Sequence, residues 1–195
     1  MLGIRRDRTA RSVTLTAVKG ERNAELEAVD VDGLKVASVG FLLGGQQGLT
    51  MAGQFAELML GRLVKQTVWG ELDVLVADLP PGTGEVQQGL LALSDDVRAV
   101  LVVTPAEVSH LDTGRAVAVL NQANVPLLGA VENMAYVVCP HCGERSALHT
   151  PAPEERTIWA LGVPKLASVP FRTDAVVSMD DVGPVADAVE AGLSR

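Results

Sequence analysis

The chain has 195 residues, a net charge of −8 and 48% hydrophobic residues, so it is globular and long enough to bury a core. The acidic balance argues against a nucleic-acid partner and against docking on an anionic membrane. No apolar run is long enough to span a bilayer, and the arginine-rich residues 1–13 lack the apolar stretch of a secretory signal. Two cysteines are too few for a disulfide scaffold.

In chain order, the pattern predicts strands alternating with helices. The first half reads as a strand at 34–41, a glycine-rich loop at 44–48, a helix at 54–65, a fully buried strand at 73–79, a loop at 80–84 and a helix at 85–93. The second half reads as strands at 97–104, 125–131 and 165–169, with helices up to residue 122, near 154–161 and at 184–193. A capping box from Thr104 to Glu107 marks the start of the helix that ends near residue 122. We therefore expect an α/β fold, a parallel sheet flanked by helices on both faces, in one domain over residues 1–195.

Polar residues follow three of the predicted strands at their carboxyl ends, where open parallel sheets bind ligands. They are Asp78 with the Pro80–Gly84 loop, Thr104, and the pair Glu132 and Asn133. An aspartate after a buried strand, followed by Gly-Thr-Gly, suits magnesium-nucleotide chemistry, but it equally suits a carboxylate that caps a tight turn. His110, on the helix after Thr104, has no partner visible in the sequence and is expected to lie in solvent.

The nucleotide interpretation lacks one element. A phosphate-binding loop has the pattern G-x-x-x-x-G-K-[ST], and none of the four lysines (Lys19, Lys35, Lys65 and Lys165) stands in such a loop. Residues 44–50, GGQQGLT, have the glycines without the lysine. We therefore expect these residues alone to have weak or no ATPase activity.

Cys139 and Cys142 form a Cys-x-x-Cys pair within the sequence Cys-Pro-His-Cys-Gly, a spacing typical of zinc and iron–sulfur ligands. One pair supplies two ligands of four. His141 and His149 would complete a zinc site within one chain, whereas a symmetric dimer would bring two pairs together at its axis. The cysteine pair could also be a redox-active dithiol or two thiols that bind no ligand.

Two longer segments carry a family resemblance. The sequence DLPPGTGEVQ, from Asp78 to Gln87, and the sequence from Glu132 through Asn133 to Cys139 and Cys142 resemble the Mrp-type (ApbC-like) iron–sulfur carrier ATPases. The resemblance covers residues 34–172, between a variable segment at 1–33 and a C-terminal segment at 173–195. It implies a P-loop NTPase fold of the MinD/ParA type.

The resemblance also implies roles for particular residues. Asp78 would help to hold Mg²⁺, and Gly82, Thr83 and Gly84 would sense the γ-phosphate of ATP. Asn133 would contact adenine. Cys139 and Cys142 would share a 4Fe–4S cluster across a homodimer, which would deliver it to apo iron–sulfur clients in the cytoplasm.

The chain also departs from the family pattern, because it resembles the family only from a point after the first strand, the phosphate-binding loop and the following helix. We therefore expect that N-terminal βαβ unit to be missing here. Two other functions are compatible with the sequence. One is a non-hydrolysing protein that pairs with a full-length relative and regulates it, and the other is a small domain stabilised by zinc.

Overall fold

A computed structural model describes residues 26–42, 53–80, 84–172 and 177–193. The chain divides into two compact units, Met1–Asp95 and Asp96–Arg195, which we describe separately. No helix within these described ranges is both long and apolar enough to cross a membrane.

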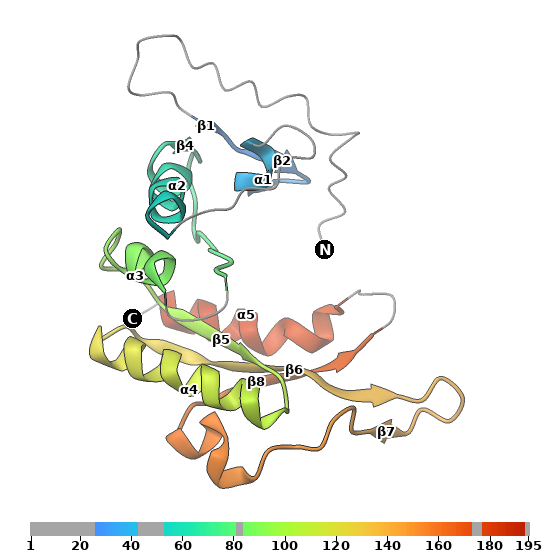
Figure 1. Cartoon of the computed structure of the whole chain (residues 1–195). Helices are drawn as coiled ribbons and strands as arrows, with labels where there is room; N and C mark the ends of the chain where they lie inside the picture. The colour runs from blue at the N-terminus through green and yellow to red at the C-terminus, as the bar shows by residue number, and fades with distance from the viewer. Residues whose placement is uncertain (1–25, 43–52, 81–83, 173–176, 194–195) are drawn as a thin grey trace, which may run out of the picture. The chain divides into compact units, whose positions relative to one another are not determined.

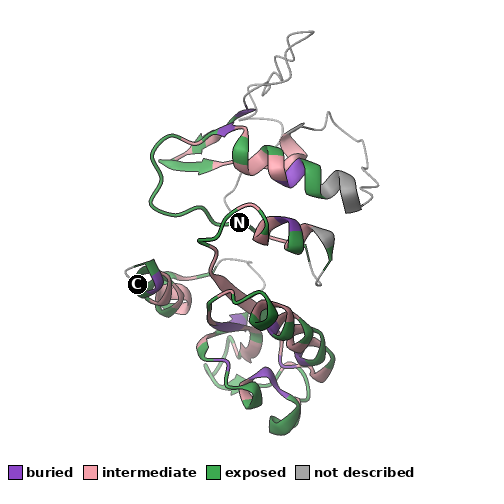
Figure 2. Cartoon of the chain, turned by 90° about the vertical axis from the view of Figure 1, so that its left-hand side faces the viewer, coloured by how far each residue is buried: buried purple, intermediate pink, exposed green. Residues whose placement is uncertain are grey.

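The second unit is built on a parallel sheet. Its strands β5 (Ala99–Val103), β6 (Leu127–Val138) and β8 (Lys165–Phe171) pair in the order β5-β6-β8, and both pairings are parallel. The short strand β7 (Arg145–Ser146) pairs antiparallel with the far end of β6. The sheet lies between α4 (Glu107–Gln122) and α5 (Met179–Leu193), one helix on each face, as Figures 1 and 2 show. This α/β arrangement confirms the predicted fold class.

The core of this unit is small and aliphatic. Val103 and Ala130 from the sheet meet Val117 of α4, with Ile158 and Val163 from the segment before β8. Ile158 lies in the second of two 3-10 turns, η1 (Glu154–Arg156) and η2 (Ile158–Leu161), where the sequence predicted an α-helix. The short 3-10 turns place Ile158 and Trp159 against the sheet without extending a helix over it.

The first unit contains short elements. Helices α1 (Val39–Leu42), α2 (Gly53–Lys65) and α3 (Glu85–Leu91) accompany a parallel pair, β1 (Leu26–Glu27) with β4 (Thr67–Val68), and an antiparallel pair, β2 (Val29–Val31) with β3 (Leu34–Val36). Helices α2 and α3 confirm the helices predicted at 54–65 and 85–93.

The strand predicted at 34–41 is wrong beyond Val36. Asp32 and Gly33 both have positive φ, of 52° and 88°, and such a turn joins β2 and β3 into a hairpin. The Ser38 hydroxyl then accepts a hydrogen bond from the Gly40 N–H at the start of α1. A local polar side chain therefore ends the extended segment and begins a helical turn.

The buried strand predicted at 73–79 is also wrong. Residues 74–79 belong to no strand, and the side chain of Val76 is 84% exposed. A strand that is apolar on both faces needs a neighbouring strand on each side for its backbone. Within the described ranges, no strand pairs with this segment.

The capping box predicted at Thr104 is a third error. Helix α4 begins at Glu107, and its N-cap residue is Ala106, which makes no side-chain cap bond. The Thr104 N–H instead donates to the hydroxyl of Ser109, 3.0 Å away. The real capping box is at α5, where Ser178 and Asp181 exchange hydrogen bonds of 3.1 and 3.2 Å.

Candidate functional site

Cys139 and Cys142 lie in the loop of the β6–β7 hairpin. Val137 pairs with Ser146 and Val138 with Arg145, so the two arms are in register up to the loop. The loop is closed by two hydrogen bonds of 2.9 Å, from the Cys139 N–H to the Glu144 carbonyl and from the Gly143 N–H to the Cys139 carbonyl. Gly143 has φ of 72°, which a glycine adopts without steric cost. The loop therefore holds both cysteines on one tight turn.

The Cys139 thiol lies in a turn that favours its ionised form. The backbone N–H groups of Cys142 and His141 donate to its sulfur, and these bonds lower its pKa from the ordinary value near 9.0. Cys142 is exposed and Cys139 is partly so, and neither is in a disulfide. A thiolate is the form that binds metal, so the turn is preorganised for a metal or cluster.

The pair has only two ligands to offer. Among the side chains that the structure describes, no group of three or more His, Cys, Asp or Glu residues lies close enough together to hold a metal ion. His141 and His149 are exposed and do not complete a four-ligand set with the cysteines in the described chain. The zinc site within one chain, one of the sequence alternatives, thus has no support from the geometry.

Asn133 and Glu132 lie on β6 a few residues before the cysteines. The Glu132 carboxylate accepts hydrogen bonds from Lys165 Nζ at 2.9 Å and from Ser168 Oγ at 3.2 Å, both on β8. This contact fixes the two strands to each other next to Asn133, which pairs in register with Val169. Lys165 and Ser168 were not predicted as site residues, because their relation to Glu132 depends on the strand register.

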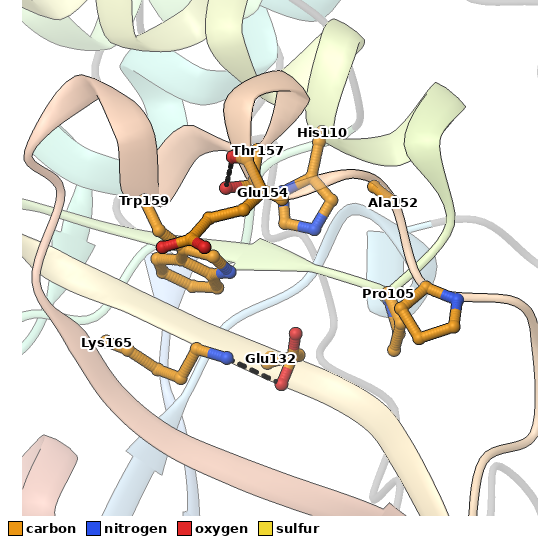
Figure 3. A pocket seen from close by; sticks show the side chains of 9 residues that line it. Pro105, His110, Glu132, Ala152, Glu154, Thr157, Trp159 and Lys165 are labelled. Carbon is orange, nitrogen blue, oxygen red and sulfur yellow. Dashed lines mark hydrogen bonds and ion pairs between the residues drawn. The ribbon is translucent and has the colours of Figure 1, made fainter.

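A cavity of about 280 Å³ opens above this ion pair (Figure 3). It is lined by residues from α4, η1, η2 and the sheet: Pro105, His110, Glu132, Pro151, Ala152, Glu154, Thr157, Trp159 and Lys165. The Lys165 ammonium lies 4.5 Å from the centre of the Trp159 ring, while its Nζ pairs with Glu132. Lys165 is therefore held by both an aromatic face and a carboxylate.

The sequence predicted that His110 lies in solvent, and this prediction is wrong. Only 3% of the residue is exposed. Its Nδ1 accepts a hydrogen bond from the Ile158 N–H, and its ring packs edge-on against Trp159 with centroids 5.7 Å apart. Burial lowers its pKa from the ordinary value near 6.5, an effect that Glu132 opposes and Lys165 reinforces. A neutral ring is also what the bond at Nδ1 requires.

The residues expected to bind phosphate and magnesium belong to the first unit. Asp78 is exposed, and Gly84 is the N-cap residue of α3. Gly82, Thr83 and the glycine-rich segment at 44–48 lie outside the described residues. Asn133 and both cysteines are in the second unit.

Comparison with known proteins decides the family. The model of the ParA family, described as the NUBPL iron-transfer P-loop NTPases, matches residues 7–192. This chain belongs to that family. The resemblance to iron–sulfur carrier ATPases that the sequence suggested is thereby confirmed, and the match extends beyond the 34–172 core.

Similar curated proteins have names of the same kind. One from Arabidopsis thaliana, the "Iron-sulfur protein required for NADH dehydrogenase, mitochondrial", is 33% identical over 86% of this chain and 54% of its own length. The "Iron-sulfur cluster transfer protein NUBPL" of Dictyostelium discoideum is 36% identical over 78% and 47%. The "Iron-sulfur cluster carrier protein" of Pseudomonas fragi is 34% identical over 82% and 56%. The chain thus spans about half the length of these relatives.

A solved structure agrees with the fold. A nucleotide-binding protein of Archaeoglobus fulgidus, in complex with ADP and with cobalt found in it, superposes with a TM-score of 0.60 at 29% sequence identity. The match covers 87% of this chain and 62% of that protein. It supports the assignment of a P-loop NTPase-like fold.

Proposed function

We propose that this protein carries a 4Fe–4S cluster on Cys139 and Cys142 and delivers it to apo iron–sulfur proteins. The observation that carries the proposal is the hairpin turn, which holds both cysteines on one loop closed by backbone hydrogen bonds. Hydrogen bonds from the backbone N–H groups of Cys142 and His141 also lower the pKa of the Cys139 thiol. Hydrogen bonds of this kind hold a ligating sulfur in place and tune the metal that it binds. Family membership and the carrier names of the relatives support the same cargo.

The number of ligands leads to the second part of the proposal, that two copies of the chain share one cluster. A cubane cluster takes four thiolates, and the described residues of one chain bring two cysteines together. A two-fold axis at the hairpin would supply the same pair again, which is the simplest way for identical chains to complete the set.

Anaerobic reconstitution with iron and sulfide tests the proposal. We expect an iron–sulfur absorbance band in the wild-type protein that Cys139→Ser and Cys142→Ser each abolish. His141→Ala is the matched control, because this side chain is in the same loop and is not needed as a ligand. A protein that binds one zinc per chain, and that loses this zinc with His141→Ala, would instead be the zinc-stabilised domain.

Nucleotide binding is a separate part of the proposal, and the chain has only some of the residues that a nucleotide site needs. By analogy with the family, Asp78 would hold Mg²⁺, while Gly82, Thr83 and Gly84 would approach the γ-phosphate and Asn133 the adenine. Asp78 is exposed and makes no ion pair among the described residues, which suits a metal ligand. No lysine in a phosphate-binding loop is available to neutralise the phosphates, so we derive no hydrolytic step for these residues.

A second candidate function is suggested by the lack of a phosphate-binding lysine in these 195 residues. A chain that shares a cluster but does not hydrolyse ATP would act by pairing with a full-length relative, regulating it or completing its cluster site. Mixing experiments separate the two, because a regulator would bind such a relative more tightly than it binds itself. For either function we propose the cytoplasm as the place of action.

A further inference from the structure

The cavity beside Glu132 and Lys165 contains a hydrogen-bond donor that the proposed function does not use. Only 3% of His110 is exposed, and its Nδ1 accepts a hydrogen bond of 3.3 Å from the Ile158 N–H. A neutral imidazole that accepts at Nδ1 carries its proton on Nε2, so Nε2 donates. Figure 3 shows this nitrogen pointing into the cavity, and it has no hydrogen-bond partner among the described residues. The donor is therefore available to a molecule that enters the cavity.

The Glu132 carboxylate supplies an acceptor in the same cavity. Its Oε2 accepts from Lys165 Nζ at 2.9 Å and from Ser168 Oγ at 3.2 Å, whereas Oε1 has no partner in the described part of the chain. The Glu132 side chain is only 15% exposed, and the two bonds hold it at the cavity wall. Burial lowers the pKa of His110, and the nearby charge of Glu132 opposes this effect. A held donor and a held acceptor thus lie close together.

The other walls of the cavity indicate what kind of molecule fits. Its volume of about 280 Å³ suits a single small ring and not a larger ligand. The charged side chains of the lining are Glu132, Glu154 and Lys165, so the lining has a net negative charge that disfavours an anionic ligand. The remaining walls are apolar or aromatic and suit the faces of a ring: Pro105, Pro151, Ala152 and Trp159.

We propose that this cavity binds a small neutral ring that carries a carboxamide group. The carboxamide N–H donates to Glu132 Oε1, its carbonyl oxygen accepts from His110 Nε2, and the ring lies against the apolar walls. Neighbouring residues of a strand point to opposite faces of the sheet, so the cavity at Glu132 is separate from the side chain of Asn133. The site also uses neither cysteine, and its test is independent of cluster binding.

Nicotinamide is the probe, and nicotinate, the same ring with a carboxylate in place of the carboxamide, is the matched control. The chain has two tryptophans, so proton–nitrogen NMR of the full chain follows two indole N–H signals, Trp159 at the cavity and Trp69 in the first unit. We expect nicotinamide to shift the Trp159 signal, with saturation in about the millimolar range for so small a ligand, and to leave Trp69 unchanged. Nicotinate should bind at least about tenfold more weakly, because it has no N–H for Glu132 and is repelled by the two carboxylates.

Three variants test the assignment of the polar groups and of the space. Glu132→Gln removes the charge that rejects an anion, so it should weaken nicotinamide binding about tenfold and reduce the preference over nicotinate. Glu155→Gln, the same change at an exposed carboxylate outside the lining, should bind both compounds as wild type does. Ala152→Leu fills the cavity and leaves its ion pair intact, and it should abolish binding.

Several results would overturn the proposal. They are a Trp159 signal that nicotinamide does not saturate, an equal shift of Trp69, and nicotinate binding as tight as that of nicotinamide. A folded Glu132→Gln protein, shown by a dispersed NMR spectrum, that keeps the full preference for the carboxamide would also overturn it. If Glu132→Gln does not fold, Ala152→Leu decides, because binding that is unchanged in this variant places the ligand elsewhere.

Discussion

At the scale of single residues, two side chains behave in ways that their sequence context does not reveal. His110 is buried and accepts a hydrogen bond from the backbone of a segment 48 positions away. The Asn133 side-chain oxygen accepts a hydrogen bond from the N–H of the next residue, Met134. The His110 contact arises from how the chain folds back on itself, and spacing along the sequence does not encode it.

His110 makes the stability of the protein depend on pH. Its pKa is lowered in the folded state, so between that pKa and the ordinary value near 6.5 the unfolded chain binds more protons than the folded chain. The contribution of His110 to the free energy of unfolding is therefore complete above pH 6.5 and is lost as the pH falls below it. Urea unfolding at several pH values measures this loss.

His110→Gln is the informative variant, because an amide oxygen can still accept from the Ile158 N–H but does not titrate in this range. We expect it to flatten the stability profile below pH 6.5, while His149→Gln, a change at an exposed histidine, leaves the profile as in wild type. An unchanged slope in His110→Gln would show that another group is responsible.

At the scale of elements, the sheet of the second unit depends on one close approach. Gly129 on β6 has φ of 152°, and a Cβ at this position would lie 2.7 Å from the Pro164 carbonyl oxygen and from the Leu166 side chain. The backbones can approach only because this residue lacks a side chain.

Gly129→Ala should therefore destabilise the protein, by about 1–3 kcal/mol in the free energy of unfolding, as overpacking does elsewhere. Gly183→Ala in α5 is the control, since a Cβ there would meet nothing within 4 Å. Denaturant unfolding of the two variants tests this, and equal midpoints would contradict the packing argument.

The start of α5 gives a prediction of another kind. Ser178 and Asp181 form a capping box, and the Asp181 carboxylate also accepts from Arg172 at 3.0 Å. Ser178→Ala should lower the free energy of unfolding by about 1 kcal/mol, whereas Ser146→Ala, at an exposed strand position, should change it little. A thermal melt that moves equally in both variants would contradict a capping role.

Local sequence signals predicted these elements unevenly. The apolar periodicity of α2 and the buried runs of β5 and β8 were sufficient, because each element follows its own pattern. The run at 73–79 is as apolar as the strands β5 and β8, but it forms no strand, because a strand also needs neighbouring strands to pair with. The sequence predicted a capping box at Thr104 and not at Ser178. Both residues have an acidic side chain three positions later, and only the fold shows which of them caps a helix.

The candidate site shows the same limit. The Cys-x-x-Cys spacing predicted a turn with two thiols, and the hairpin has it. The sequence did not reveal the contact of Lys165 with Glu132, because it depends on the register between β6 and β8.

At the scale of the whole molecule, the sequence leads to a prediction about nucleotide binding. These 195 residues contain no G-x-x-x-x-G-K-[ST] loop, so the triphosphate lacks its usual lysine and backbone cradle. We expect isothermal titration of Mg–ATP into the protein to show no binding in the micromolar range. A micromolar dissociation constant would mean that other residues of the chain replace that loop.

The central claim is that one chain holds half of a thiolate site and that a second copy completes it. Native mass spectrometry of the anaerobically reconstituted protein tests this most directly, because it weighs the chains and the inorganic atoms together. We predict that the cluster-bound species contains two chains and one 4Fe–4S cluster, and that the Cys139→Ser protein shows no such species. A single chain that retains a complete cluster would contradict the account.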